Sequence, residues 1–186
     1  MGIKIAVIVG SLRKESLNRK MAKALISLAS SALKPQIIEI GDLPLYNQDL
    51  DDEGKVPAAW NHFREQINSC QGVLFVTPEY NRSVPGVLKN AIDVGSRPYG
   101  QSVWSKKPGA VISVSPGAIG GFGANNHLRQ SFVFLDIPVL QQPEAYIGMA
   151  GNLFNAQGEI TNEDTRKFLK KFMEAYSDWV ELHTQA

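Results

Sequence analysis

The chain has 186 residues, of which 44% are hydrophobic and 20% charged, an ordinary composition for a globular protein of one domain. Its formal net charge of +1 gives no electrostatic reason to expect binding to nucleic acid or to an acidic membrane surface. The N-terminus leads directly into an apolar segment without the cationic region of a secretory signal. We therefore expect a cytoplasmic protein with no membrane insertion, folded as a single domain over residues 1–186.

The first elements are a buried strand and an amphipathic helix. Residues 3–9 are apolar except for Lys4 and too few to span a membrane, so they predict a strand covered on both faces, as in a parallel sheet. From Leu17, apolar residues recur at spacings of three and four up to Leu28, which predicts a helix with one buried face. A second strand is expected at 36–40, which completes a right-handed βαβ unit.

The loop between that strand and that helix carries polar groups suited to an anion. Gly10 allows the turn, and Ser11, Arg13, Ser16 and Asn18 offer hydroxyls, a guanidinium and an amide at the start of a helix, where main-chain N–H groups are free. This pattern predicts a phosphate site. The alternative is that Ser16 is an ordinary helix cap and that the basic residues form a solvated patch. The loop matches neither GxxxxGK[ST] nor GxGxxG, so nothing supports a nucleoside triphosphatase or a Rossmann dinucleotide fold.

The remainder of the chain continues to alternate strands and helices. Residues 41–55 are turn-rich and acidic and predict a surface loop, and Cys70, the single cysteine, is expected to be a small core residue. The further predicted elements are a helix from Pro57 to about Cys70, a strand at 72–77, a helix at 87–94, a strand at 109–115, a helix at 125–135, a strand at 138–141 and a helix at 163–182 with Phe168, Phe172, Ala175 and Trp179 on one side.

Five strands alternating with helices predict an α/β three-layer sandwich of the flavodoxin-like type, with a five-stranded parallel sheet of order 2-1-3-4-5. Polar loops at 78–86 and 116–123 follow the third and fourth strands, and the second of them has four glycines in eight residues. Glycines let the backbone approach a flat ligand closely, although a flexible connection would have the same composition. A phosphate at the first loop and a flat ring between the other two is the outline of flavin mononucleotide (FMN).

Three motifs resemble those of a known family over nearly the whole chain: GSLRKESLNRK at 10–20, VTPEYNRSVPGVLKNAIDVGSRPYG at 76–100 and SVSPGAIGGFGA at 113–124. They are similar to the motifs of the NADPH-dependent FMN reductases, and within them to the bacterial quinone and chromate reductases. The resemblance implies non-covalent FMN, oxidation of NADPH or NADH, and reduction of quinones with side activity towards acceptors such as chromate. It also implies a homodimer, often paired into a homotetramer.

The resemblance also implies which residues hold the cofactor. The family's phosphate-binding positions fall on Ser11, Arg13, Ser16, Leu17 and Asn18, and its contacts with the isoalloxazine ring fall on Pro78, Glu79, Tyr80, Asn81 and Ser115. Arg82 is either an acceptor-site residue or a link between subunits. We expect no catalytic acid or base in the protein, because the flavin performs the electron chemistry, in a ping-pong sequence that moves both electrons together. The three histidines, at 62, 127 and 183, lack the spacing of metal ligands, so no metal site is expected.

Other functions on the same fold remain open. An electron carrier of flavodoxin type would have the fold and the cofactor, but such carriers are usually strongly acidic, whereas this chain is nearly neutral. A phosphoacceptor signalling domain would need acidic residues after the first strand and an aspartate ending the third, where this chain has Gly10-Ser11 and Pro78-Glu79. A non-catalytic FMN-binding protein is the third alternative, and turnover of NADPH with a soluble quinone would distinguish it from an enzyme.

Overall fold

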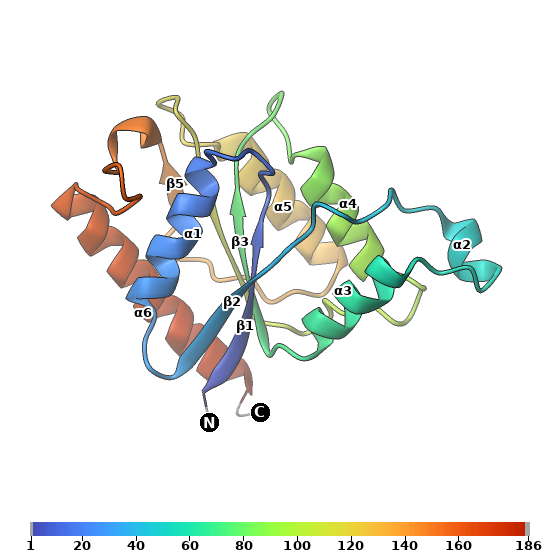
Figure 1. The fold of residues 1–186 in the computed structure, drawn as a ribbon. Coiled ribbons are helices and arrows are strands. Elements are labelled where there is room, and N and C mark those ends of the chain that lie inside the picture. The colour runs from blue at the N-terminus through green and yellow to red at the C-terminus, as the bar shows by residue number, and fades with distance from the viewer. Residues whose placement is uncertain (1, 185–186) are drawn as a thin grey trace.

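The structure is a computed structural model that describes residues 2–184. In this part of the chain five parallel strands form one sheet, whose order β2-β1-β3-β4-β5 confirms the predicted 2-1-3-4-5 arrangement (Figure 1). The strands are β1 (Ile3–Val9), β2 (Leu33–Ile38), β3 (Gly72–Thr77), β4 (Gly109–Val114) and β5 (Ala145–Ile147).

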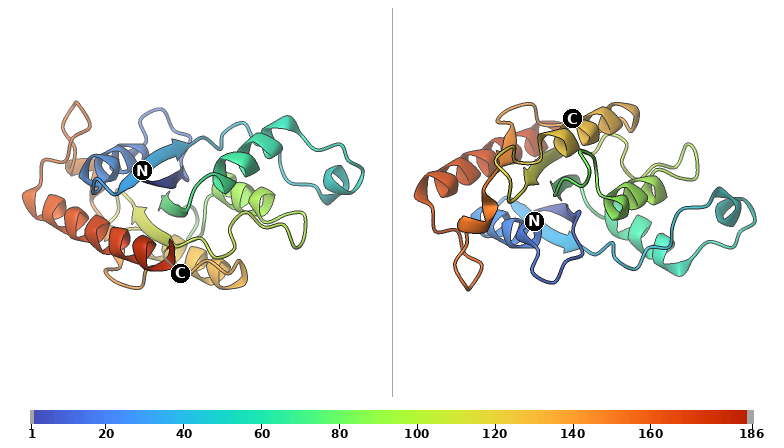
Figure 2. Two further views of the ribbon diagram at one scale, coloured as in Figure 1. Left: turned by 90° about the horizontal axis from the view of Figure 1, so that it is seen from below. Right: turned by 90° about the horizontal axis from the view of Figure 1, so that it is seen from above.

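Helices cover both faces of the sheet and make the outer layers of the sandwich (Figure 2). Helices α1 (Leu17–Leu28) and α6 (Glu163–Thr184) pack on one face. Helices α3 (Ala58–Asn68), α4 (Gly86–Gly95) and α5 (Phe122–Phe134) pack on the other. A short helix α2 (Gln48–Asp52) and a 3₁₀ helix η1 (Ala150–Asn152) complete the described elements.

Two apolar cores lie on either side of the central strands. Successive side chains of β1 alternate between them: Ile5 and Val7 face α1 and α6, whereas Ala6 and Ile8 face the other helices. All residues of β3 and β4 are buried. This double burial explains why these strands are mostly apolar in the sequence, with Thr77 and Ser113 as the exceptions.

The position of the fifth strand was predicted wrongly. At 138–141 the structure has only an isolated bridge, in which Val139 pairs with Gly109 at the start of β4, and the strand proper is Ala145–Ile147. The main chain around Pro138 and Leu140 does bond to Gly109, but the pairing with β4 then stops and resumes only at Ala145. Pro138 itself has no N–H to extend the ladder.

Smaller differences concern element boundaries. Strand β2 spans 33–38 instead of 36–40, and it accommodates Pro35 because it is an edge strand, where one missing N–H is tolerated. The expected loop at 41–55 contains α2, which is capped by the side chain of Asn47 and projects from the body of the molecule (Figure 1). Helix α5 begins at Phe122, three residues earlier than predicted.

The side of the closing helix that was predicted to be apolar packs on the core. Phe172 is buried, and Phe168, Ala175 and Trp179 are partly buried and pack against the same apolar cluster. The buried positions are Leu169, Phe172, Met173, Tyr176, Ser177 and Val180. Among the described helices none is long and apolar enough to cross a membrane.

Candidate functional site

A cavity of about 210 Å³ opens at the carboxyl ends of β1, β3 and β4, the upper end of the sheet in Figure 1. Three loops line it, and they are the three that the sequence singles out. Every predicted cofactor contact except Asn81 belongs to the lining. The lining residues are Ser11, Arg13, Ser16, Leu17, Asn18, Pro78, Glu79, Tyr80, Val114, Ser115 and Pro116.

The first loop presents free donors at the start of α1. Ser16 is the helix cap, and its Oγ accepts a hydrogen bond from the N–H of Arg19 at 3.1 Å. The capping role weighed as an alternative is therefore real, yet it leaves the Ser16 hydroxyl free to donate. The N–H groups of Leu17 and Asn18 lie in the first turn, where a helix has no internal acceptors for them. Ser11, buried to 5% exposure, adds a second hydroxyl.

Arg13 is the basic side chain of this loop that reaches the cavity. Arg19 is instead paired with Glu39, whose pKa is lowered chiefly by the hydrogen bond from that guanidinium. Lys20 is paired with Glu15 at 3.4 Å. Arg13 makes no ion pair with any residue between 2 and 184, so its charge is available to an anion. This arrangement suits a phosphate group.

Asn18 has an unsatisfied acceptor beside these donors. Its side chain is 4% exposed, and its Nδ2 donates to the carbonyl of Val114 at 3.3 Å. The Oδ1 atom is buried without a hydrogen-bond partner among the described residues. A buried acceptor of this kind calls for a donor, and a ligand hydroxyl would supply one. The ribityl chain of FMN carries such hydroxyls next to its phosphate, so the residues present fit this cofactor.

The second loop forms a tight hairpin after Pro78. Tyr80 and Ser83 exchange main-chain hydrogen bonds of 3.1 and 3.0 Å, and the two residues between them, Asn81 and Arg82, have left-handed backbone conformations with φ of 51° and 64°. Tyr80 lines the cavity and is 46% exposed, whereas Asn81 is not part of the lining. The assignment of Asn81 to the cofactor stays a prediction.

Arg82 and Glu79 are bound to each other. Arg82 donates from Nη1 to the Glu79 carboxylate at 2.9 Å, with its own side chain 74% exposed and that of Glu79 only 9% exposed. The second oxygen of Glu79 accepts a hydrogen bond from the N–H of Ala124 at 3.1 Å. The carboxylate of Glu79 is therefore already bonded within the protein, which the sequence did not indicate.

The third loop has hydrogen bonds to the rest of the structure. Ser115 bonds through its main chain to Ile147 and Ala150, and its Oγ accepts from the N–H of Gly117 at 3.1 Å. Gly120 and Gly121 have φ of 67° and 76°, which glycine adopts without strain.

Two buried polar residues behind this loop were missed. Ser113 donates from Oγ to the carbonyl of Gly120 at 2.7 Å, and Asn125 donates from Nδ2 to Ser113 Oγ at 3.3 Å. Asn125 is in turn bonded to Arg129 on the next turn of α5. Ser113 could have been identified from the sequence, because it is a polar residue inside an otherwise apolar strand.

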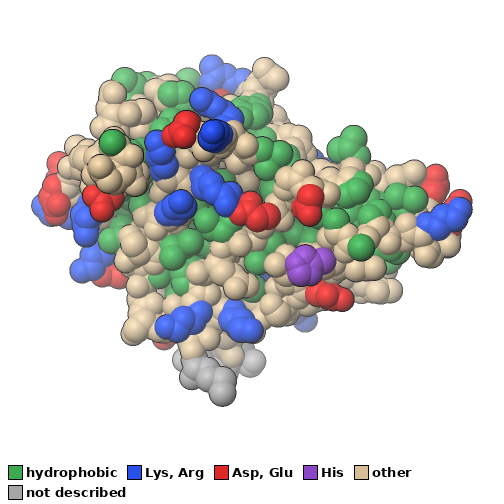
Figure 3. Space-filling view, viewed as in Figure 1, with side chains coloured by type: hydrophobic (Ala, Val, Ile, Leu, Met, Phe, Trp, Pro, Cys, Tyr) green, Lys and Arg blue, Asp and Glu red, His purple; other side chains and the backbone are tan. Residues whose placement is uncertain are grey.

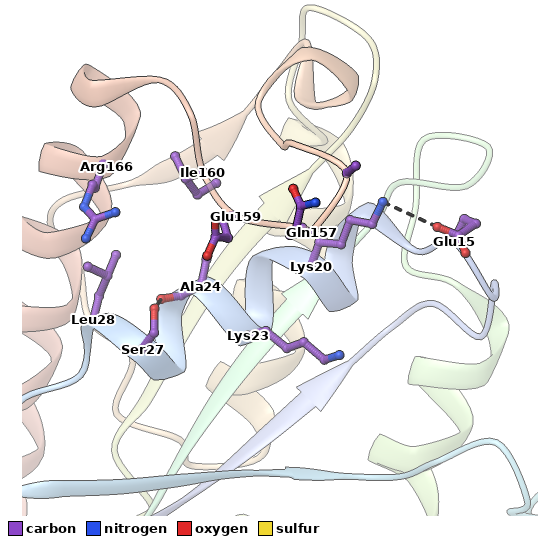
Figure 4. A pocket seen from close by; sticks show the side chains of 12 residues that line it. Glu15, Lys20, Lys23, Ala24, Ser27, Leu28, Gln157, Glu159, Ile160 and Arg166 are labelled. Carbon is purple, nitrogen blue, oxygen red and sulfur yellow. Dashed lines mark hydrogen bonds and ion pairs between the residues drawn. The ribbon is translucent and has the colours of Figure 1, made fainter.

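A larger cavity of about 540 Å³ lies elsewhere, between α1 and the segment 156–160 (Figure 4). Its charged residues are of both signs. Lys20 is directed toward Glu15, and Glu159 accepts a hydrogen bond from Asn155 at 2.9 Å. It lies along the side of α1 and away from the strand ends, where open α/β sheets bind ligands. We therefore place the functional site in the smaller cavity.

In the part of the chain that the structure describes, the histidines form no metal centre, and the face shown in Figure 3 carries no patch of one charge sign. On the face shown in Figure 3, Lys and Arg side chains are interspersed with Asp and Glu. Between residues 2 and 184 no three His, Cys, Asp or Glu side chains are grouped so as to hold a metal ion. His127 bonds to Ser83 at 3.0 Å and His183 to the carbonyl of Trp179 at 2.8 Å.

Comparison with known proteins agrees with this geometry. The model of the family described as NADPH-dependent FMN reductase matches residues 3–152. A protein named quinone reductase from Pseudomonas putida is 64% identical over 179 residues, which cover 96% of this chain and 95% of the relative. A protein from a Burkholderia species, named 2-hydroxy-1,4-benzoquinone reductase, is 52% identical over 97% of both chains.

A solved structure is similar throughout. It is the flavoenzyme NAD(P)H:(acceptor) oxidoreductase FerB from Paracoccus denitrificans, which is 45% identical, covers 97% of this chain and 98% of its own, and superposes with a TM-score of 0.91. Together with the family match and the identities above 50%, this likeness establishes that the chain belongs to the NADPH-dependent FMN reductase family.

Proposed function

We propose that this protein is an FMN-dependent oxidoreductase that uses NADPH or NADH to reduce quinones. The observation that supports it most directly is the composition of the cavity. Donors from the start of α1 line it together with main-chain groups of the other two loops and Tyr80. A flavin mononucleotide combines the two complementary features, a phosphate and a flat ring. The relatives named quinone reductases support the class of acceptor.

The residues that would hold FMN fall into two sets. At the phosphate, the N–H groups of Leu17 and Asn18, the hydroxyls of Ser11 and Ser16 and the guanidinium of Arg13 would donate hydrogen bonds. The ring would be contacted by the segment from Pro78 to Tyr80 and by Ser115. Asn81, from the same loop, would be a further contact of the ring, and Arg82 would line the acceptor site or link subunits.

When bound, FMN accepts hydride from the nicotinamide and delivers two electrons to the acceptor. The protein binds and orients the reactants. We assign no side chain as catalytic acid or base. Tyr80 lines the cavity and is 46% exposed, and we expect the nicotinamide and the quinone to occupy the same site in turn. This order of events is a ping-pong sequence.

Several finer features belong to the same proposal. Chromate would be a side substrate, as the resemblance to the chromate reductases implies. The active form would be a homodimer or homotetramer in the cytoplasm. An electron-carrier role is less favoured, because the nearly neutral charge lacks the acidic surface by which such carriers dock on their partners.

Purified protein tests the proposal. We expect a yellow preparation with one FMN per chain that oxidises NADPH with a soluble benzoquinone, with parallel double-reciprocal lines when both substrates are varied. A colourless protein that does not take up FMN would contradict the cofactor. A yellow protein that does not turn over NADPH and quinone would instead indicate a carrier or a binding protein.

A further inference from the structure

Helix α5 begins immediately after the glycine-rich third loop and lacks a cap of its own. Its N-cap residue is Gly121, which provides no side-chain hydrogen bond. The first-turn N–H of Ala124 is instead bonded to Oε2 of Glu79, which comes from the loop after β3, 45 positions away. A carboxylate from another loop therefore takes the place of a capping residue, and a negative charge at a helix N-terminus is favourable.

The backbone around this contact leaves no space for a side chain. A Cβ atom on Gly123 would lie 2.8 Å from the carbonyl oxygen of Arg82 and 2.9 Å from Glu79 Oε2. One on Gly121 would lie 2.9 Å from the Cβ of Ser113. The glycines thus allow the end of the third loop to approach the second loop closely enough for the carboxylate to reach the helix.

The second loop needs such support. Asn81 and Arg82 are consecutive non-glycine residues with positive φ, a conformation that a free chain rarely adopts. Side-chain contacts join this hairpin to α5, among them the bond from the N–H of Ala124 to Glu79 and the bond between Ser83 Oγ and His127 Nδ1 at 3.0 Å. Arg82, within the turn, forms an ion pair with the carboxylate of Glu79, the same group that binds Ala124.

We propose that Glu79 is a positioning residue whose carboxylate holds the hairpin 80–83 against the first turn of α5. It thereby sets the gap between Tyr80 and Ser115 that the flavin ring enters. Glu79 acts through these two loops and not by touching the ring with its side chain. The inference rests on the proposed function for the identity of the ligand. The contact itself exists without any ligand.

The charge state of Glu79 is consistent with this role. Burial raises the pKa of its carboxyl. The hydrogen bonds from the N–H of Ala124, from Arg82 and from the N–H of Gly123 together lower the pKa by more than burial raises it, so the net pKa is below the ordinary value. The group is therefore ionised at neutral pH, as an acceptor of these donors must be.

The test compares Glu79→Ala and Glu79→Gln with the control Asp93→Ala, which removes an exposed carboxylate paired with Lys89 on α4. The first measurement is hydrogen exchange of the Ala124 amide in the apoprotein. The second is the dissociation constant of FMN, together with the absorption spectrum of the bound flavin. We expect Glu79→Ala to speed exchange and weaken FMN binding by about 10-fold or more each, while the circular dichroism stays native.

Glu79→Gln keeps an acceptor for Ala124 but loses the charge, so we expect an intermediate effect, and Asp93→Ala should match the wild type. A variant that only melts at a lower temperature, with exchange, FMN affinity and flavin spectrum unchanged, would overturn the proposal. If Glu79→Ala does not fold, wild-type exchange and affinity in Glu79→Gln would overturn it equally. Failure of the wild type to bind FMN would contradict the proposed function, whereas the exchange measurement would still decide whether the contact holds the hairpin.

Discussion

The side-chain Nδ2 of Asn18, on α1, donates a hydrogen bond to the main-chain carbonyl of Val114, at the end of β4, over 3.3 Å. The bond joins the first and third loops of the site across 96 positions of sequence. It also orients the amide so that its buried Oδ1 remains without a partner among the described residues.

Asn18→Ala therefore removes both the link and the free acceptor. A neutral hydrogen bond contributes about 0.5–1.5 kcal/mol, so we expect FMN to bind about 2- to 12-fold more weakly. Fluorescence titration of the apoprotein measures this. Asn61→Ala, an exposed position on α3, is the matched control. Equal affinity in the two variants would remove Asn18 from the site.

The phosphate assignment predicts a difference between FMN and riboflavin, which lacks the phosphate. Arg13→Ala should weaken FMN binding by about 10- to 100-fold, because a hydrogen bond from a charged group contributes roughly 1.5–3 kcal/mol. Riboflavin affinity should not change. Lys14→Ala, an exposed neighbour outside the cavity, should alter neither. A parallel loss for both ligands would place Arg13 away from the phosphate.

Ser16 needs a substitution that separates capping from ligand binding. Ser16→Asp retains a helix cap, so the free energy of unfolding should change by less than about 1 kcal/mol. Its carboxylate would repel a phosphate, and FMN affinity should fall at least about 10-fold more than riboflavin affinity. Titration of both ligands with the apoprotein checks the difference, and unchanged FMN binding would contradict it.

Tyr80 should affect the ligands more than the fold, because it is 46% exposed at the cavity mouth. We expect Tyr80→Ala to change the flavin absorption spectrum or the KM for the quinone by about 3-fold or more, with the urea midpoint of unfolding nearly unchanged. Tyr80→Phe, which retains the ring, should behave like the wild type. Wild-type spectra and kinetics in Tyr80→Ala would mean that the second loop does not border the ligand.

The packing of Trp104 gives a test of the core that is independent of function. Trp104 is fully buried, and a Cβ on Gly95 would lie 2.6 Å from its indole ring. Gly95→Ala should therefore lower the free energy of unfolding by about 1–3 kcal/mol in urea titration. Gly86→Ala, on the same helix with open space at its Cβ, should be neutral or stabilising by up to about 1 kcal/mol. Similar effects at both sites would contradict the close packing of Trp104 against Gly95.

The lowered pKa of Glu79 predicts how stability depends on pH. A carboxyl whose folded-state pKa lies below its ordinary value of 4.5 stabilises the folded protein at pH above that value, and the contribution is lost as pH falls through the folded-state pKa. The difference in free energy of unfolding between wild type and Glu79→Ala should be constant above about pH 6 and shrink toward pH 3. A difference that stays constant down to pH 3 would contradict the shift.

Local patterns were sufficient for much of the architecture and for the loops that line the cavity. The strands at 3–9 and 72–77 were predicted with their observed bounds, because strands buried on both faces are mostly apolar. The meeting of the polar loops after strands β1, β3 and β4 could also be predicted, because the carboxyl ends of parallel strands lie at the same edge of a sheet. These are properties of neighbouring residues, and the chain order displays them.

The remaining features depend on residues far apart in the chain. The pairing at β5, the bond from Asn125 to Ser113 and the reach of Glu79 to Ala124 leave no periodic trace in the sequence. Each depends on where two separate segments meet in space. The sequence by itself therefore determined which loops and polar side chains lie at the carboxyl edge of the sheet. Only the tertiary structure decided which of them face the cavity and which, like the carboxylate of Glu79, are bonded to the protein itself, because a hydrogen bond depends on the distance and direction between two folded segments.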